Sequence, residues 1–256
     1  MKLHRTSFVL PVLALLANAG TQAAQNGTPG QEVEARFALA AWGEQAKIKN
    51  LFGEELGTLA DHVVERASGR LAFAIVEHAG TDGGRRRTVV PYTQFTWDKK
   101  QQELLLPLNK EQLEGLPEYD AEALQGLGSE DRPADTDEME GDQPPVRNLL
   151  SSSIQGTRLS AGDAPFGSVT ALVIEPRKGT VAFALVHSTG ARDKEPATVV
   201  PWSALAWNER TGFSVPVSAQ ELESAPKLEA GSLKPLEDKA TLRTISELFP
   251  PLEVKN

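Results

Sequence analysis

The feature that most constrains the fold of this chain is an internal repeat, because two copies of one segment are expected to fold alike. The segment GRLAFAIVE begins at Gly69, and GTVAFALVH begins 110 positions later at Gly179. Other residues recur at the same offset: Gly57/Gly167, Val63/Val173, Glu65/Glu175, Thr88/Thr198, Pro91/Pro201 and Trp97/Trp207. One copy covers about residues 39–119 and the other about residues 149–228, which predicts two small duplicated domains.

Each copy shows the alternation of a β-strand. The bulky residues Leu71, Phe73 and Ile75 alternate with alanines, and successive strand side chains point to opposite faces of a sheet. We expect the bulky face to fill a core and the alanine face to be covered by a closely approaching element. Capping boxes at Asn109 and Ser218 predict a short helix at the end of each copy. The predicted fold is therefore mainly all-β, with two small antiparallel β-barrels, each closed by a short helix.

The N-terminus has the pattern of a secretory signal peptide. Lys2 and Arg5 precede the apolar run FVLPVLALL at residues 8–16, and small residues follow, so the signal peptide is predicted to span 1–19 or 1–23. The run is shorter than the about 20 apolar residues needed to span a bilayer, although an uncleaved anchor is an alternative. The protein is predicted to be periplasmic or secreted, with no transmembrane segment after cleavage.

Three further segments lie outside the copies: an N-terminal segment at residues 24–38, an acidic linker at 120–148, and a tail at 229–256. From Glu118 to Asp142 there are ten Asp or Glu residues and one Arg, a composition typical of a disordered linker. The tail has apolar residues at helical spacing, which predicts a C-terminal helix within residues 236–249.

Charge and cysteine content exclude several classes of function. The formal net charge is −9, and the chain contains no cysteine. A nucleic-acid partner is not expected, because phosphate binding needs a basic face. Without cysteine the chain can form neither a thiolate metal site nor a cysteine nucleophile.

No residue pattern predicts a catalytic, metal or cofactor site. His62, His78 and His187 have no metal-ligand spacing, and we interpret them as surface or strand-end residues. The segment 135–142 is similar to a calcium loop, but Met139 falls on a ligand position and the turn glycine is missing. No nucleophile elbow, Walker loop or dinucleotide fingerprint is present. The protein is therefore predicted not to be an enzyme and to bind no cofactor or metal; weak cation association of the linker stays an alternative.

Both copies resemble a PRC-barrel domain. The features that carry the resemblance are a glycine-led strand from Gly57 to Asp61, a Ser-Gly turn, a hydrophobic strand, a Val-Pro-aromatic step and a trailing Leu-Glu…Pro segment. The resemblance implies a small, mostly antiparallel β-barrel that acts as a protein-binding or assembly module. The family includes the cytoplasmic domain of the photosynthetic reaction-centre H subunit and part of a ribosome-maturation factor. It has no shared catalytic residues to transfer, and Asp61, typical of the family's strand, is replaced by Ala171 in the second copy.

Two groups of residues are candidates for contacts with a partner. The aromatic residues of the Val-Pro-aromatic step and the strand after it are Tyr92, Trp97, Trp202 and Trp207. They either pack inside the fold or form a docking edge, since aromatic residues dominate interface energetics. The basic run Arg85, Arg86 and Arg87 is either a solvated loop or a docking site for an acidic partner, an anionic lipid surface or the chain's own linker.

These observations predict a non-enzymatic protein-interaction or assembly module. Its partner would be another envelope protein or a second copy of the chain, and its process would be envelope or stress homeostasis. Two alternatives stay open: a small-ligand binder or enzyme with a site between the barrels, and a membrane-surface or cation-associated protein.

Overall fold

The computed structural model describes residues 38–40, 46–98, 101, 103–120, 148–191, 195–208 and 210–249. The predicted signal peptide, nearly all of the acidic linker and the calcium-like loop lie outside the described residues. Among the helices that are described, none is long and apolar enough to cross a bilayer.

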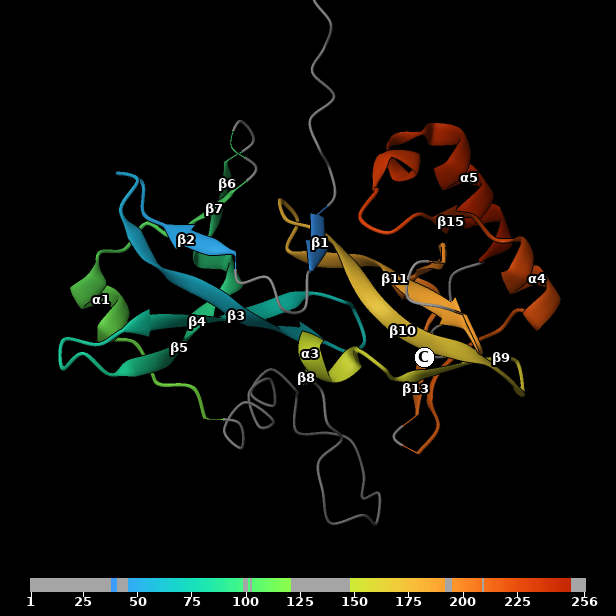
Figure 1. Cartoon of the computed structure of the whole chain (residues 1–256), viewed down its shortest axis with the longest axis horizontal. Coiled ribbons are helices and arrows are strands. Elements are labelled where there is room, and N and C mark those ends of the chain that lie inside the picture. Colours follow the sequence, from blue (N-terminus) through green and yellow to red (C-terminus); the bar gives the residue numbers. More distant parts are fainter. Residues whose placement is uncertain are drawn as a thin grey trace, which may run out of the picture. The chain divides into compact units, whose positions relative to one another are not determined.

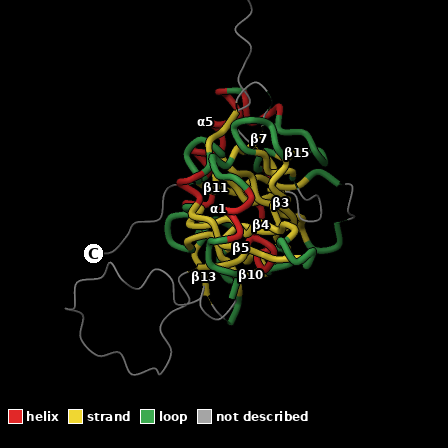
Figure 2. Tube along the Cα trace, turned by 90° about the vertical axis from the view of Figure 1, so that its left-hand side faces the viewer, coloured by secondary structure: helices red, strands yellow, loops and turns green. Residues whose placement is uncertain are grey.

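Strands are more abundant than helices in the described trace (Figure 2). The first copy contains β2 (Lys47–Lys49), β3 (Glu55–Glu65), β4 (Leu71–Ala79), β5 (Arg85–Pro91), η1 (Tyr92–Gln94), β6 (Thr96–Asp98), β7 (Glu103–Leu105) and α1 (Lys110–Glu114). The second copy contains β9 (Arg158–Ala161), β10 (Ala164–Glu175), β11 (Thr180–Ser188), β12 (Ala197–Pro201), η2 (Trp202–Ala204), β13 (Ala206–Asn208), β14 (Gly212–Val215), α4 (Ala219–Ser224) and β15 (Lys227–Leu228). The elements follow in the same order in both copies.

Each copy forms one sheet. The strand order is β5-β4-β3-β2-β7-β6 in the first copy and β13-β14-β9-β10-β11-β12-β15 in the second. Most neighbours are antiparallel, as predicted, but β2 is parallel to β7 and β9 is parallel to β14. The parallel pair arises because the chain crosses from β5 to the far edge before the β6–β7 hairpin returns beside β2. Within the described residues neither order closes on itself, so the β class is confirmed and closure into a barrel is not shown.

The central strands pair in the same register in both copies. Phe73 lies opposite Pro91 on β4 and β5, and Phe183 lies opposite Pro201 on β11 and β12. This agreement explains why proline recurs there: it ends the strand and starts η1 or η2, so its missing N–H breaks no later ladder bond.

A recurring glycine has a steric reason. A Cβ on Gly57 would lie 2.3 Å from the carbonyl oxygen of Glu77, and a Cβ on Gly167 would lie 1.8 Å from that of His187. Both glycines sit where β3 or β10 crosses the neighbouring strand. Only a residue without a side chain allows the two backbones to approach this closely.

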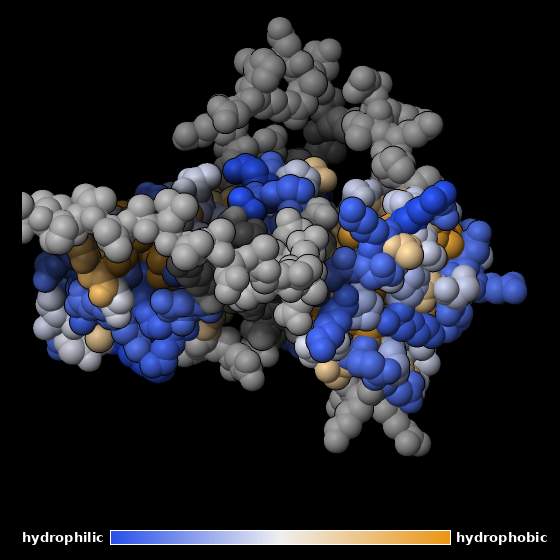
Figure 3. Space-filling view, turned by 90° about the horizontal axis from the view of Figure 1, so that it is seen from above, coloured by the Kyte–Doolittle hydropathy of each residue, from blue (hydrophilic) through white to orange (hydrophobic). Residues whose placement is uncertain are grey.

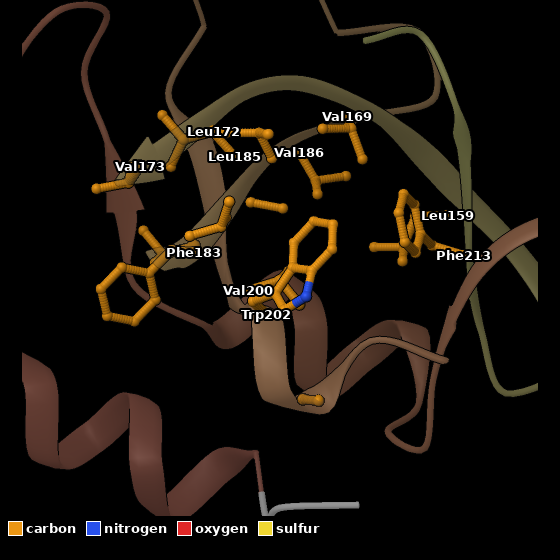
Figure 4. Close-up of a cluster of buried hydrophobic side chains, with 14 of the residues drawn as sticks. Leu159, Val169, Leu172, Val173, Phe183, Leu185, Val186, Val200, Trp202 and Phe213 are labelled. Carbon is orange, nitrogen blue, oxygen red and sulfur yellow. The ribbon is translucent and has the colours of Figure 1, made fainter. Parts of the chain in front are cut away.

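The larger hydrophobic core runs through both copies. Figure 4 shows its side chains from β9, β10, β11, β12 and β14 gathered around Trp202. Ala74 and Ala184, on the predicted alanine face, are fully buried, so that face is covered as expected. The residues of the first copy that join this core are Val64, Leu71, Ala74 and Tyr92. One copy on its own would expose part of this core.

The helix predictions are confirmed. Asn109 and Ser218 each accept a hydrogen bond in a complete capping box, which starts α1 and α4. The C-terminal helix is divided in two: η3 (Lys234–Glu237) is followed by α5 (Lys239–Leu248), and Asp238 caps α5. The side chains that attach this tail to the core are Leu236, Ile245 and Phe249.

The two copies exchange their first strands. The strand β1 (Ala38–Ala40) opens the first copy but pairs with β10 of the second, and β8 (Asn148–Leu150) opens the second copy but pairs with β3 of the first (Figure 1). A short helix, α3 (Ser151–Ile154), follows β8. Each sheet therefore includes a strand from the other copy, a connection that the repeat pattern alone did not predict.

Candidate functional site

The copies meet at the two glycines that open the recurring segment. The amide of Leu71 donates to the carbonyl oxygen of Gly179 at 2.8 Å, and the amide of Val181 donates to that of Gly69 at 2.8 Å. Arg70 and Thr180 form the bridge between them. These contacts are equivalent at the repeat offset, so the junction has approximate two-fold symmetry. We use "junction" for this bridge together with the exchanged strand β8 and the two aromatic contacts described next.

Tyr92 and Trp202, two of the predicted interaction residues, are buried in the junction. Trp202 lies against Gly69, where an added Cβ would be 2.5 Å from the indole Cδ1, and its Nε1–H donates to the carbonyl oxygen of Arg66 at 3.2 Å. Tyr92 makes the equivalent contact with Gly179, and its hydroxyl donates to Pro176 at 3.5 Å. Each aromatic residue therefore holds the other copy, and neither is exposed to an outside partner.

The other two aromatic candidates lie on edge strands of the sheets. Trp97 on β6 is half-buried opposite Leu104. Trp207 on β13 is half-buried and meets the ring of Phe213 edge-on, with ring centroids 4.8 Å apart. The indole N–H of Trp207 has no hydrogen-bond partner among the described residues. Both residues contribute packing, and the structure does not bring them together with Tyr92 and Trp202 as one docking edge.

Each arginine of the run is paired with a nearby carboxylate. Arg85 and Arg87 both pair with Glu77, at 3.3 and 3.1 Å, and Arg86 pairs with Asp82 at 3.1 Å. The backbone N–H of Gly84 and the Arg86 guanidinium hold the pKa of the Asp82 carboxyl below its usual range. An anionic surface would have to compete with these internal partners for each arginine.

Asp61 has a structural role at the start of the second copy. Its carboxylate accepts hydrogen bonds from the hydroxyls of Ser151 and Ser152 and, at 3.1 Å, from the Ser152 amide. These contacts cap the first turn of α3, where unpaired N–H groups favour a carboxylate. Ala171, at the equivalent position of the second copy, has no side-chain acceptor and cannot make these hydrogen bonds.

Two of the three histidines are buried, so the prediction of a surface position was wrong for them, although His78 lies at the end of β4 as the strand-end alternative predicted. His62 is 4% exposed, and burial lowers its pKa to about 4, opposed by the nearby Asp61 charge. His78 is also buried, and its Nε2 is 2.7 Å from the Thr88 hydroxyl. The physical reason for His62 is that Tyr92 and α3 lie against this part of β3. No group of three His, Cys, Asp or Glu residues within the described ranges could hold a metal ion.

Sequence reasoning missed one feature, the loop between β2 and β3. Leu51 is 59% exposed and Phe52 is 96% exposed, and they are the exposed large apolar residues of the described chain. Polar residues otherwise cover most of the described surface visible in Figure 3. The available signal was a comparison of the copies, because the second copy makes the same connection with only Gly162 and Asp163. We call Leu51 and Phe52 the apolar tip.

The loop that carries the apolar tip is held by Asn50. Its buried side chain accepts hydrogen bonds from the amides of Phe52 at 3.0 Å and Glu54 at 2.9 Å, and donates to the Glu54 carboxylate at 3.0 Å. Gly53 completes the turn with φ of +81°, a conformation that glycine adopts without strain. The tip is therefore presented by an ordered turn.

Comparison with known proteins adds no family assignment. No protein-family model matches the chain, and no curated protein matches it. The resemblance to PRC-barrel domains therefore rests on the residues of this sequence alone.

Proposed function

We propose that this chain is a non-enzymatic protein-interaction module of PRC-barrel type, exported to the periplasm or the cell exterior, and that the apolar tip docks in a pocket of an envelope protein. The observation that supports this function is the exposure of Phe52, at 96%. Burying a phenylalanine stabilises a complex by roughly 1.5–3 kcal/mol. A phenylalanine side chain that stays exposed to water does not gain this stabilisation.

The comparison of the copies indicates that the apolar tip serves something other than folding. The second copy connects β9 to β10 with Gly162 and Asp163, and its sheet has the same order and register. An apolar tip is therefore not needed to make this hairpin. The Asn50 hydrogen bonds also fix the loop before binding, which lowers the entropy lost on association.

The charges beside the apolar tip favour a protein partner over an anionic lipid surface. Three ion pairs flank the tip: Lys47–Glu55, Lys49–Glu103 and Lys110–Glu54. Each lysine is thus neutralised, whereas electrostatic attraction to membranes needs a cluster of unpaired basic residues. An apolar centre with a polar, charge-balanced rim is the usual anatomy of a protein interface.

The test places a photo-crosslinking amino acid at position 52 and, as the matched control, at position 163 in the equivalent hairpin. In cells that naturally make the protein, we expect a crosslinked protein from position 52 and none from position 163. The captured protein, once purified, should bind the Phe52→Ala variant about 30-fold more weakly, the loss of about 2 kcal/mol typical of a hot-spot residue. Asp163→Ala should leave the affinity within twofold.

Three results would contradict the proposal. One is equal crosslinking from both positions, or none from position 52. Another is crosslinking of the chain to itself, which would make the partner a second copy. The third is Phe52-dependent binding to liposomes of neutral and anionic lipids, which would favour the membrane-surface alternative.

A further inference from the structure

One buried imidazole at the junction has no hydrogen-bond partner for its Nε2 among the described residues. This residue, His62, is 4% exposed and lies on β3. An unpaired buried polar atom costs free energy that an apolar side chain would not. The presence of such a group in a native structure needs an explanation, and the packing of the fold does not provide it.

The second copy shows that the fold accepts an apolar residue at this place. Leu172 occupies the equivalent position on β10 and is fully buried. The sheets of the two copies share their register around these residues. The first copy therefore has a buried histidine where the second copy has an apolar residue that needs no hydrogen bond.

The attachments of the second copy to β3 converge on this histidine. Its neighbour Asp61 caps α3, and its other neighbour Val63 pairs with Leu150 of β8. Its ring lies 6.1 Å from the ring of Tyr92, which reaches across to the second copy. A change at His62 would thus act on β8, α3 and η1 together.

We propose that His62 makes the junction acid-sensitive: when its imidazole takes up a proton, β8, α3 and Tyr92 separate from β3 and the two copies loosen. The inference is independent of the proposed function, because it concerns how the copies are held together. Protonation opens the junction because a buried imidazolium is disfavoured unless an opposite charge compensates it.

The surroundings of the ring offer little compensation. Asp61 is the charged group that acts on it, and the Asp61 carboxylate is already bound by the two serines of α3. From η1 the titratable neighbour is Tyr92, whose pKa burial raises, so it stays neutral. On β4 the register partner of His62 is the apolar Ala74, and the pairing of β3 with β8 begins at the next residue, Val63, opposite the apolar Leu150.

The direction and size of the effect follow from proton linkage. The folded-state pKa of His62 is about 4, below its ordinary value of 6.5. The open form therefore binds the proton first as the pH falls below 6.5, so stability is complete above that pH and is lost on acidification until the folded form also titrates near 4. Between pH 7.5 and pH 5 the opening constant should rise about 30-fold.

The experiment measures amide hydrogen exchange, corrected for intrinsic rates, at pH 7.5 and pH 5. The reporters are the amides of Leu71 and Val181, which bond across the junction, and the reference amides are those of residues 184–186 in the middle of β11. The variants are His62→Leu, which copies the second repeat, and His187→Leu as the control histidine. In wild type and His187→Leu, acid should lower the protection of the reporters by about 30-fold relative to His62→Leu.

The reverse exchange supplies a second test that does not depend on the folding of His62→Leu. In Leu172→His the second copy should gain the same acid response around β1 and β10. The inference fails if acid lowers reporter and reference protection equally in wild type, which would be ordinary acid unfolding. It also fails if His62→Leu keeps the wild-type response, or if Leu172→His gains none.

Discussion

Replacing Gly69 with alanine tests the junction directly. Gly69 has φ of +72°, and an added Cβ would lie 2.5 Å from Cδ1 and 2.9 Å from Nε1 of Trp202. The indole cannot retreat freely, because it is buried in the core and its N–H is bonded to Arg66. The left-handed backbone costs alanine about 1–2 kcal/mol, and overpacking adds about 1–3 kcal/mol. The expected total loss in free energy of unfolding is about 2–5 kcal/mol.

A matched variant separates these two contributions. Gly83 has φ of +79° and nothing within 4 Å of an added Cβ, so Gly83→Ala should show the backbone cost alone. Urea denaturation of both variants, followed by far-UV circular dichroism, gives the two free energies at unchanged m. Gly179→Ala, which meets Tyr92 at 2.8 Å, should behave like Gly69→Ala.

The steric reasoning makes a further claim about coupling. In a Trp202→Ala background the indole is gone, so Gly69→Ala should cost no more than Gly83→Ala, and a double-mutant cycle should give a coupling of about 1–3 kcal/mol. A Gly69→Ala variant as stable as Gly83→Ala, or a coupling near zero, would refute the proposed contact across the junction.

Three other perturbations test the remaining elements. Asp61→Ala should cost about 1–3 kcal/mol, because the buried Ser151 hydroxyl loses its acceptor; faster hydrogen exchange confined to α3 and β8 would support this, and unchanged exchange would contradict it. Ser218→Ala and Asn109→Ala should each cost about 1 kcal/mol by removing a cap, measured by urea denaturation; no loss would mean that the capping boxes are not formed in solution. The two copies expressed as separate chains should each lack a stable fold by circular dichroism and regain it on mixing, because each sheet takes a strand from the other copy; a fold in either copy alone would contradict the exchange.

Local features of the sequence were sufficient for the duplication, the β class and the short helices. The caps at Asn109 and Ser218 act within a few residues, so their effect can be seen without knowing the rest of the chain. The alternation around Phe73 likewise identifies a strand with one bulky and one small face, since strand side chains alternate whatever covers them. The exposed Phe52 could also have been found, by comparing the two hairpins.

The pairing between copies was decided by the tertiary structure alone. Alternation predicts that a strand is covered, but two copies with the same register offer equivalent edges, so β1 and β8 could pair within their own copy or exchange. The same ambiguity hid the roles of Tyr92 and Trp202, which look like an exposed docking edge until the other copy covers them. The contacts of His62 with β8 and α3 depend on the same choice, because both elements belong to the other copy. Both copies carry the same contact-forming residues, so only the tertiary structure determines whether a contact forms within one copy or between the two.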